Sequence, residues 1–243
     1  MSTVPIGGDI IEVVAPCLPS APATCHLKKH GEGGYMIIMQ THHPSALTHL
    51  ERIESHQLAQ SIFTHSTPES DMVQYHPKGI PGGVIPELDS HRPHPDYPDP
   101  LGERFSPWHA AGPEEKYGVY VEGMKRHAHL WLVDVTLRLE AGGGDVEGAA
   151  RKWEDIFGAG RRKGVGELLF TNAKMVFLRG ENGAREGLVE VGIAVEGRER
   201  RDGIFKRARE EGLRVDGDVV EMLGIRWKFM VLDRRVEKKK SKL

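Results

Sequence analysis

The stretch Gly187-Leu188-Val189-Glu190-Val191-Gly192-Ile193-Ala194-Val195 is the clearest guide to the fold. Its odd positions from Val189 to Val195 are all β-branched and apolar, which is the pattern of a strand with one buried face. A helix is expected next, ending at Gly212, and two strands at residues 219–223 and 225–232 follow it. The segment therefore predicts a strand, a helix and further strands in that order.

The same order of elements recurs earlier in the chain, with a period of roughly 50 residues that is typical of internal repeats. A strand at residues 133–139 precedes a helix expected from Asp145 to Gly158, and strands at residues 167–170 and 174–178 follow. The chain is therefore expected to repeat one supersecondary unit.

A further copy begins with the apolar run Gly33 to Gln40. The break at His43-Pro44 ends this strand, and Ser45 is the expected N-cap of the next helix. Three short strands are expected at residues 58–64, 72–76 and 83–88. The copies together predict an α+β protein of repeated βαβββ modules, which form cupped mixed sheets in two tandem domains.

A stretch rich in proline, from Ser90 to Tyr120, separates the copies and is not expected to sustain a helix or an interior strand. The expected division is an N-terminal domain at residues 1–89, a Pro- and His-rich connection at 90–127, a C-terminal domain at 128–233 and a basic tail at 234–243.

Several of these segments resemble glyoxalase-like members of the vicinal-oxygen-chelate (VOC) superfamily, which includes bleomycin-resistance proteins and extradiol dioxygenases. The resemblance is carried by Gly8 to Pro16, Gly31 to Met36, and His76-Pro77-Lys78 before Gly82-Gly83-Val84. In the distal half it is carried by Arg185-Glu186-Gly187-Leu188-Val189 and by Gly224 to Phe229. The family fold implies tandem βαβββ modules around a small-molecule cavity.

The resemblance also implies site residues. Glu12 matches the last-strand metal ligand of a first module, and Glu87 matches that of a second module. Tyr35 stands where the second module's first strand carries His in the family, and it is expected to donate a hydrogen bond to a developing enolate. Glu12, Glu87 and Tyr35 are the expected catalytic residues of one cavity.

A metal site is expected to use Glu12 and Glu87, with His76 as a further ligand. Two carboxylates and water suit a divalent ion such as Mg²⁺ or Mn²⁺, with Fe and Zn as further candidates, and otherwise no cofactor is expected. The distal half has no His or Cys after His129, so it is expected to be structural or an unmetallated binding lobe.

The expected function is small-molecule lyase or isomerase chemistry next to a carbonyl. The segment from His76 to Leu88 is similar to the end of methylmalonyl-CoA epimerase, which points to acyl-CoA substrates. The alternatives are a non-catalytic small-molecule-binding protein of this superfamily and a truncated, inactive copy. Glu12 lies close to the start of the chain, so the first strand and helix of the first module are expected to come from a partner chain, as in a homodimer, or from upstream sequence.

Composition excludes other classes of function. A net charge of −2 offers no global basic surface for nucleic acid. No apolar run approaches the roughly 20 residues of a membrane span, and the N-terminus has no secretory signal. The cysteines Cys17 and Cys25 are too few for a disulfide scaffold.

The last three residues, Ser241-Lys242-Leu243, match a peroxisomal targeting signal of the PTS1 type. They follow the charged run Glu237 to Lys240, which is expected to keep them accessible. The sequence therefore predicts a peroxisomal protein whose partners are a small-molecule substrate and the peroxisomal import receptor.

Overall fold

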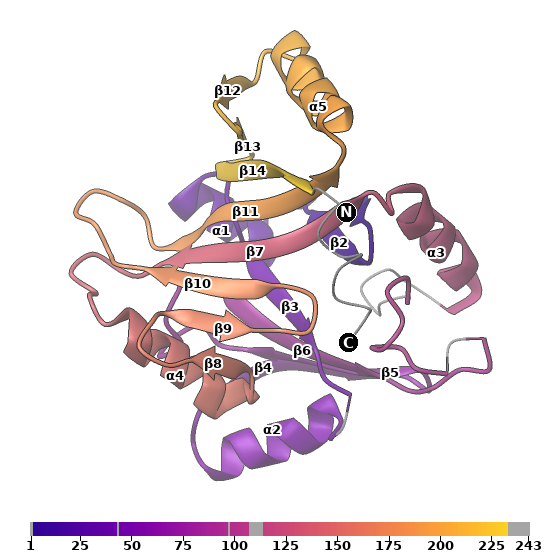
Figure 1. Cartoon of the computed structure of the whole chain (residues 1–243). Coiled ribbons are helices and arrows are strands. Elements are labelled where there is room, and N and C mark those ends of the chain that lie inside the picture. Colours follow the sequence, from indigo (N-terminus) through magenta and orange to yellow (C-terminus); the bar gives the residue numbers. More distant parts are fainter. Residues whose placement is uncertain (1, 43, 97, 107–113, 233–243) are drawn as a thin grey trace, which may run out of the picture.

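The computed structural model describes residues 2–42, 44–96, 98–106 and 114–232, and it contains the βαβββ unit three times (Figure 1). The first copy comprises β3 (Met36–Gln40), α2 (Ala46–Ser55), β4 (Ser61–Ser66), β5 (Ser70–Tyr75) and β6 (Ile85–His91). The second comprises β7 (Leu130–Arg138), α4 (Val146–Phe157), β8 (Gly160–Arg162), β9 (Glu167–Leu169) and β10 (Lys174–Leu178). The third comprises β11 (Gly187–Glu196), α5 (Arg198–Glu210), β12 (Arg214–Asp216), β13 (Val219–Met222) and β14 (Ile225–Leu232). The expected α+β class and the repeated unit are confirmed.

Strand pairing is the same in each copy. The first strand runs parallel to the last, as β3 with β6, β7 with β10, and β11 with β14. A parallel pair needs a long crossover, which the helix of each unit provides. The first copy forms a four-stranded sheet in the order β3-β6-β5-β4, whereas β7 and β11 pair antiparallel and join the other two copies into one eight-stranded sheet.

Two capping residues show how the sequence sets the helix ends. The Ser45 hydroxyl accepts a hydrogen bond from the amide of Thr48 at the start of α2, as expected of an N-cap. Asp145 caps α4 in the same way, and Gly158 ends that helix in a left-handed conformation. The starts of α2 and α4 therefore follow from local sequence.

The N-terminal segment adds a hairpin and a helix that the sequence predicted only in part. β1 (Ser2–Ile6) pairs antiparallel with β2 (Asp9–Val13), and α1 (Pro22–His30) follows. Strand β2 lies within the segment Gly8 to Pro16, where the family resemblance implied a last strand that carries Glu12. Its Ile11 packs against the core of the third copy, so the hairpin rests on the eight-stranded sheet.

The main hydrophobic core spans the expected division between the two domains. It joins residues of the first copy, such as Tyr75, to residues of the second, such as Trp153. The indole nitrogen of Trp153 donates to the carbonyl of Pro81 at 2.8 Å, and the guanidinium of Arg52 donates to carbonyls at the end of α4. The two segments of sequence therefore share a core.

The connection contains a helix that was not expected. β6 extends to His91, and α3 (Tyr117–Arg126) forms the last part of the segment. The prolines of this region end at Pro113, and Tyr117, Val121 and Met124 then recur at helical spacing and are buried. The prediction that this segment would not sustain a helix was therefore wrong for its last part, because the prolines lie only in the residues before the helix.

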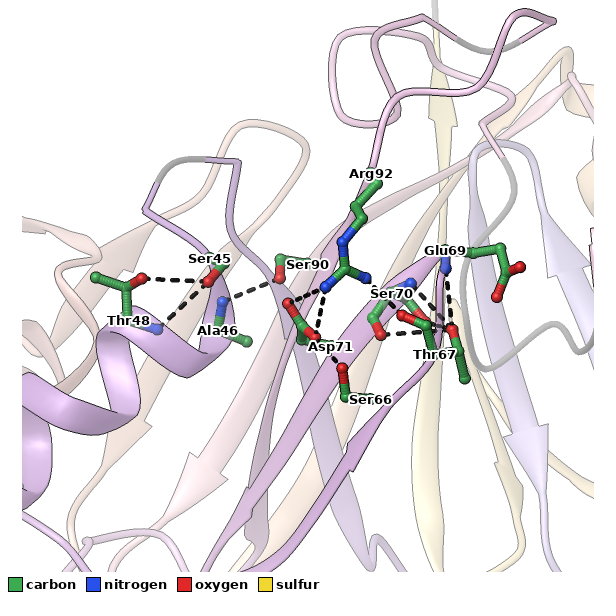
Figure 2. Close-up of polar contacts among 10 residues, drawn as sticks. All are labelled: Ser45, Ala46, Thr48, Ser66, Thr67, Glu69, Ser70, Asp71, Ser90 and Arg92. Carbon is green, nitrogen blue, oxygen red and sulfur yellow. Dashed lines mark hydrogen bonds and ion pairs between the residues drawn. The ribbon is translucent and has the colours of Figure 1, made fainter.

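A polar network lies at one end of the four-stranded sheet (Figure 2). Asp71 is 4% exposed, and its carboxylate accepts two bonds from Arg92, at 2.9 and 3.1 Å, and one from Ser66 at 2.6 Å. The hydroxyl of Ser90 accepts from the amide of Ala46, which joins the sheet to α2. This buried aspartate is fully partnered, so its role is structural.

In the described part of the chain, no helix is long and apolar enough to cross a membrane. Cys17 and Cys25 are free and exposed. The signal Ser241-Lys242-Leu243 lies outside the described residues.

Candidate active site

Glu87 and Asp89 lie two residues apart on β6, so both side chains emerge from the same face of the four-stranded sheet. Glu87 is 3% exposed and Asp89 is fully buried. Across the strands, Gln74 of β5 is opposite Glu87 and Gln40 of β3 is opposite Asp89. Two carboxyl groups and two amides therefore share this face.

Glu12 approaches these groups from the N-terminal hairpin. Ile11 faces the core of the third copy, so the alternation of strand β2 turns the next side chain, Glu12, the other way. The negative charge of Glu87 acts on Glu12, and that of Glu12 acts on Asp89. We call Glu12, Glu87 and Asp89 the acid cluster.

Several polar atoms at this site are buried without a hydrogen-bond partner in the described structure. They are Oε1 of Glu12 and Nε2 of Gln40. Both carboxyl oxygens of Asp89 also receive no bond from a donor group, and Asp89 is hydrogen-bonded to Glu87 only when one of the two carboxyl groups carries a proton. By contrast, Nε2 of Gln74 donates to Oε2 of Glu87 at 2.6 Å and holds that side chain in place. Buried polar atoms are normally partnered, so this concentration of exceptions marks the acid cluster as a functional candidate.

Burial and mutual repulsion determine the protonation of the acid cluster. Burial, then the charge of Glu87, a hydrogen bond to Glu87 and the charge of Glu12 raise the pKa of Asp89 to about 8. Burial also raises the pKa of Glu87, and burial together with the charge of Glu87 raises the pKa of Glu12. Asp89 is therefore mostly protonated at neutral pH, and a proton donor lies beside carboxylates that can accept a proton.

The structure brings Glu12 and Glu87 together, as the sequence predicted, but it places Tyr35 elsewhere. Tyr35 lies one residue before β3, and strand alternation directs it away from the face that carries Gln40. Its ring packs edge-on against the ring of His26, with centroids 5.0 Å apart. Tyr35 therefore contacts α1 and does not lie between the two glutamates.

His76 also has a different role from the one expected of it. Its Nδ1 accepts a hydrogen bond from the amide of Lys78 at 2.9 Å, so the ring stabilises the turn after β5. Among the described residues, no group of three or more His, Cys, Asp or Glu side chains is placed to hold one metal ion. The expected set of Glu12, Glu87 and His76 does not form, because the ring of His76 is engaged in its own turn.

Sequence reasoning missed Asp89, Gln40 and Gln74. Asp89 follows Glu87 by two residues, and this spacing on a strand could have indicated a second carboxyl on the same face. Gln40 ends an apolar strand and Gln74 lies on β5, and only the register of the sheet shows that they face the acid cluster.

Comparisons with known proteins give remote structural likenesses. No protein-family model and no curated protein sequence matches the chain. A hypothetical protein from Staphylococcus aureus is 11% identical, with a TM-score of 0.49 over 87% of this chain and 72% of that one. A 2,2',3-trihydroxybiphenyl 1,2-dioxygenase from Sphingomonas wittichii strain RW1 is 10% identical, with a TM-score of 0.47 over 82% and 70%. A catechol 2,3-dioxygenase is 13% identical, with a TM-score of 0.45 over 84% and 70%. Likenesses this distant carry no conclusion about activity.

Proposed function

We propose that this chain is a glyoxalase-like small-molecule enzyme that moves a proton on the carbon next to a carbonyl, in lyase or isomerase chemistry. The observation that carries the proposal is the acid cluster, with its raised pKa values and its unpartnered polar atoms. Acid and base groups whose pKa values lie near the working pH are the usual means of such a transfer.

The geometry suggests a role for each group. Glu12 is the most exposed carboxyl of the acid cluster, so it is the one that a substrate can reach, and its raised pKa makes it a stronger base. In the proposed step, the Glu12 carboxylate takes the proton from the carbon, and the electron pair moves to the carbonyl oxygen as an enolate. Gln40 has a free amide donor for that oxygen, and protonated Asp89 supplies a proton to the acid cluster.

The substrate class and location are part of the same proposal. The similarity of residues 76–88 to an acyl-CoA epimerase favours acyl thioesters, and the C-terminal Ser241-Lys242-Leu243 favours import into peroxisomes through the receptor for that signal. A fluorescent fusion that keeps the C-terminus free should enter peroxisomes, and deletion of the last three residues should leave it outside. Equal distribution of the two fusions would contradict the proposed location.

Deuterium exchange tests the proton transfer without knowledge of the product. The full chain is incubated in D₂O with a 2-methyl-branched acyl-CoA thioester, and incorporation of deuterium at carbon 2 is followed by mass spectrometry. The wild-type protein should catalyse exchange, and Glu12→Gln should lose it by about 100-fold or more. Arg214→Gln is the control, because Arg214 is exposed and far along the chain on β12.

The near-complete burial of Glu87 and Asp89 favours one alternative, a small-molecule-binding protein without turnover. Binding of the thioester with no exchange, unchanged by Glu12→Gln, would support that alternative against the enzyme. Elemental analysis of the purified protein separately tests whether Glu12 and Glu87 hold a divalent ion with water as the other ligands. If a metal-free protein catalyses deuterium exchange, the reaction does not require a metal ion.

A further inference from the structure

A hollow of about 390 Å³ lies on one face of the eight-stranded sheet, far from the acid cluster in the sequence. Strands β7, β10, β11 and β14, adjacent in Figure 1, form its floor. Thr136 and Arg138 project from β7 opposite Val176 and Leu178 of β10, and Glu190 of β11 is opposite Arg226 of β14. We call this cavity the distal hollow.

Three arginines and two glutamates line the distal hollow. Only one of the arginines forms an ion pair with one of these glutamates. Arg226 pairs with Glu190 at 3.2 Å. The carboxylate of Glu186 accepts a bond from the amide of Gly82 instead of from an arginine. The two remaining arginines, Arg138 and Arg185, are not paired with either glutamate of the distal hollow.

Arg138 has only a weak acidic partner. Its guanidinium lies 3.8 Å from the carboxylate of Glu181, a side chain that is 66% exposed, and such pairs contribute little. The side chain of Arg138 is 22% exposed, and its Nε is buried without a hydrogen-bond partner in the described structure. One donor of this guanidinium is therefore unused.

Arg185 is held entirely by neutral groups. Its Nη1 donates to the carbonyls of His30 and Glu32, and its Nη2 donates to Nε2 of His26 at 3.0 Å. Among the described residues, no carboxylate lies within 4 Å of this guanidinium. Burial lowers its pKa, as expected of a cation that is partly removed from water without an anion.

The rest of the wall is partly apolar. Val176, Leu178 and Leu188 line the distal hollow beside the arginines. Leu178 is 40% exposed, so the structure leaves apolar surface open at this point. Cationic groups beside apolar surface suit a molecule that has an anionic head and a hydrocarbon body.

Sequence segments far apart converge at the distal hollow. The backbone of Gly33 passes so close that a Cβ there would lie 2.8 Å from the guanidinium of Arg185. Gly224, in a left-handed conformation with φ of 69°, approaches the carbonyl of Glu32 in the same way. The glycine-rich segment before β3 therefore meets the segments around Arg185 and Gly224 at one cavity.

From this arrangement we infer that the distal hollow binds a small organic monocarboxylate, whose anionic head lies between Arg138 and Arg185 and whose hydrocarbon body contacts the apolar wall. This inference is independent of the proposed chemistry at the acid cluster. It assigns a ligand to the distal half, which the sequence predicted to be structural or an unmetallated binding lobe.

Calorimetric titration of the full chain with straight-chain carboxylates from butanoate to octanoate tests the inference. Affinity should rise about fourfold for each added methylene until the apolar wall is covered. The primary alcohol of the same length should bind at least about 10-fold more weakly, because it lacks the charge that the arginines attract. Inorganic phosphate should also bind weakly, because it has no hydrocarbon body.

Three variants connect the binding to the named side chains. Arg138→Gln and Arg185→Gln should each weaken octanoate binding about 10-fold or more. Glu186→Gln should strengthen it, because this change removes a negative charge from the distal hollow while the amide oxygen can still accept from Gly82. A gain of affinity does not arise from misfolding, so this variant keeps the test informative even if an arginine variant is unstable.

The inference is overturned by absence of carboxylate binding in the wild-type protein, by equal binding of the alcohols or of phosphate, or by Glu186→Gln leaving the affinity unchanged. Arg214→Gln, on the exposed β12, is the control for non-specific loss of positive charge.

Discussion

The acid cluster and the distal hollow lie on different copies of the βαβββ unit and have opposite charge. At the four-stranded sheet, two carboxyl groups of β6 and one of β2 gather beside two amides, and burial keeps part of them protonated. On the eight-stranded sheet, arginines gather beside two glutamates and remain charged. The comparison shows that the fold provides a face, whereas the side chains at a few strand positions determine its chemistry.

One histidine of the proximal half also takes part in the distal hollow. All thirteen histidines lie between His26 and His129, and the sequence therefore predicted a distal half that is structural or an unmetallated binding lobe. In the structure, His26 of α1 reaches across and accepts a hydrogen bond from Arg185. Because arginine only donates, Nε2 of His26 must be unprotonated in this contact. Residues separated in sequence therefore meet at the edge of the distal hollow.

The largest expected effects are on deuterium exchange and come from substitutions in the acid cluster. Asp89→Asn removes the proton donor of the acid cluster and should lower deuterium exchange at least 10-fold, next to the larger loss expected for Glu12→Gln. Exchange rates measured from pH 5 to 9 distinguish a chemical role from a structural one, because loss of an acid alters the pH profile. An unchanged rate and profile in Asp89→Asn would remove Asp89 from the mechanism.

The next effect concerns stability and pH. Folding raises the pKa of Asp89 from 3.8 to about 8, so the native state binds more protons than the unfolded state between these values, and stability falls as pH rises. This group alone should lower the free energy of unfolding by roughly 2 to 3 kcal/mol from pH 5 to pH 7.

Urea unfolding of the wild-type protein and of Asp89→Asn at several pH values measures this contribution. The difference between the two proteins is the relevant quantity, because partly buried histidines such as His26 have lowered pKa values and act in the opposite direction. A difference that does not change with pH would contradict the protonated state of Asp89.

A partnered carboxylate on the same sheet should behave oppositely. Asp71→Asn weakens the contacts to Arg92 and Ser66 and should destabilise the protein by about 1 to 3 kcal/mol at pH 7. Asp89→Asn should instead stabilise it at that pH. Equilibrium unfolding of both variants provides the test, and the same sign for both would contradict the distinction between the two aspartates.

The smallest expected effect is on octanoate affinity and concerns the position of Arg185 in the distal hollow. Gly33→Ala should displace the guanidinium of Arg185, whose Nη1 would lie 2.8 Å from the new Cβ, and should weaken octanoate binding a few-fold. Gly142→Ala is the matched control, because Gly142 also has a positive φ, of 83°, and open space surrounds its Cβ position. Equal affinities of the two variants would indicate that the position of Arg185 does not matter for binding.

Local sequence patterns predicted the strands and helices of the βαβββ units. The β-branched positions from Val189 to Val195 gave β11, and Ser45 and Gly158 marked helix ends, because these signals depend only on neighbouring residues. The α3 helix was missed because the prolines before it dominated the segment. Glu12 and Glu87 were paired only through the family resemblance.

By itself, the sequence determined the repeated βαβββ order, because strand alternation, helix periodicity and caps are properties of short segments. Only the tertiary structure decided which side chains meet. Sheet register placed Gln40 and Gln74 beside the acidic residues of β6, and packing brought Arg185 against α1. The physical reason is that such contacts depend on strand pairing and on burial between segments more than 100 residues apart in some cases, and no short stretch of sequence encodes them.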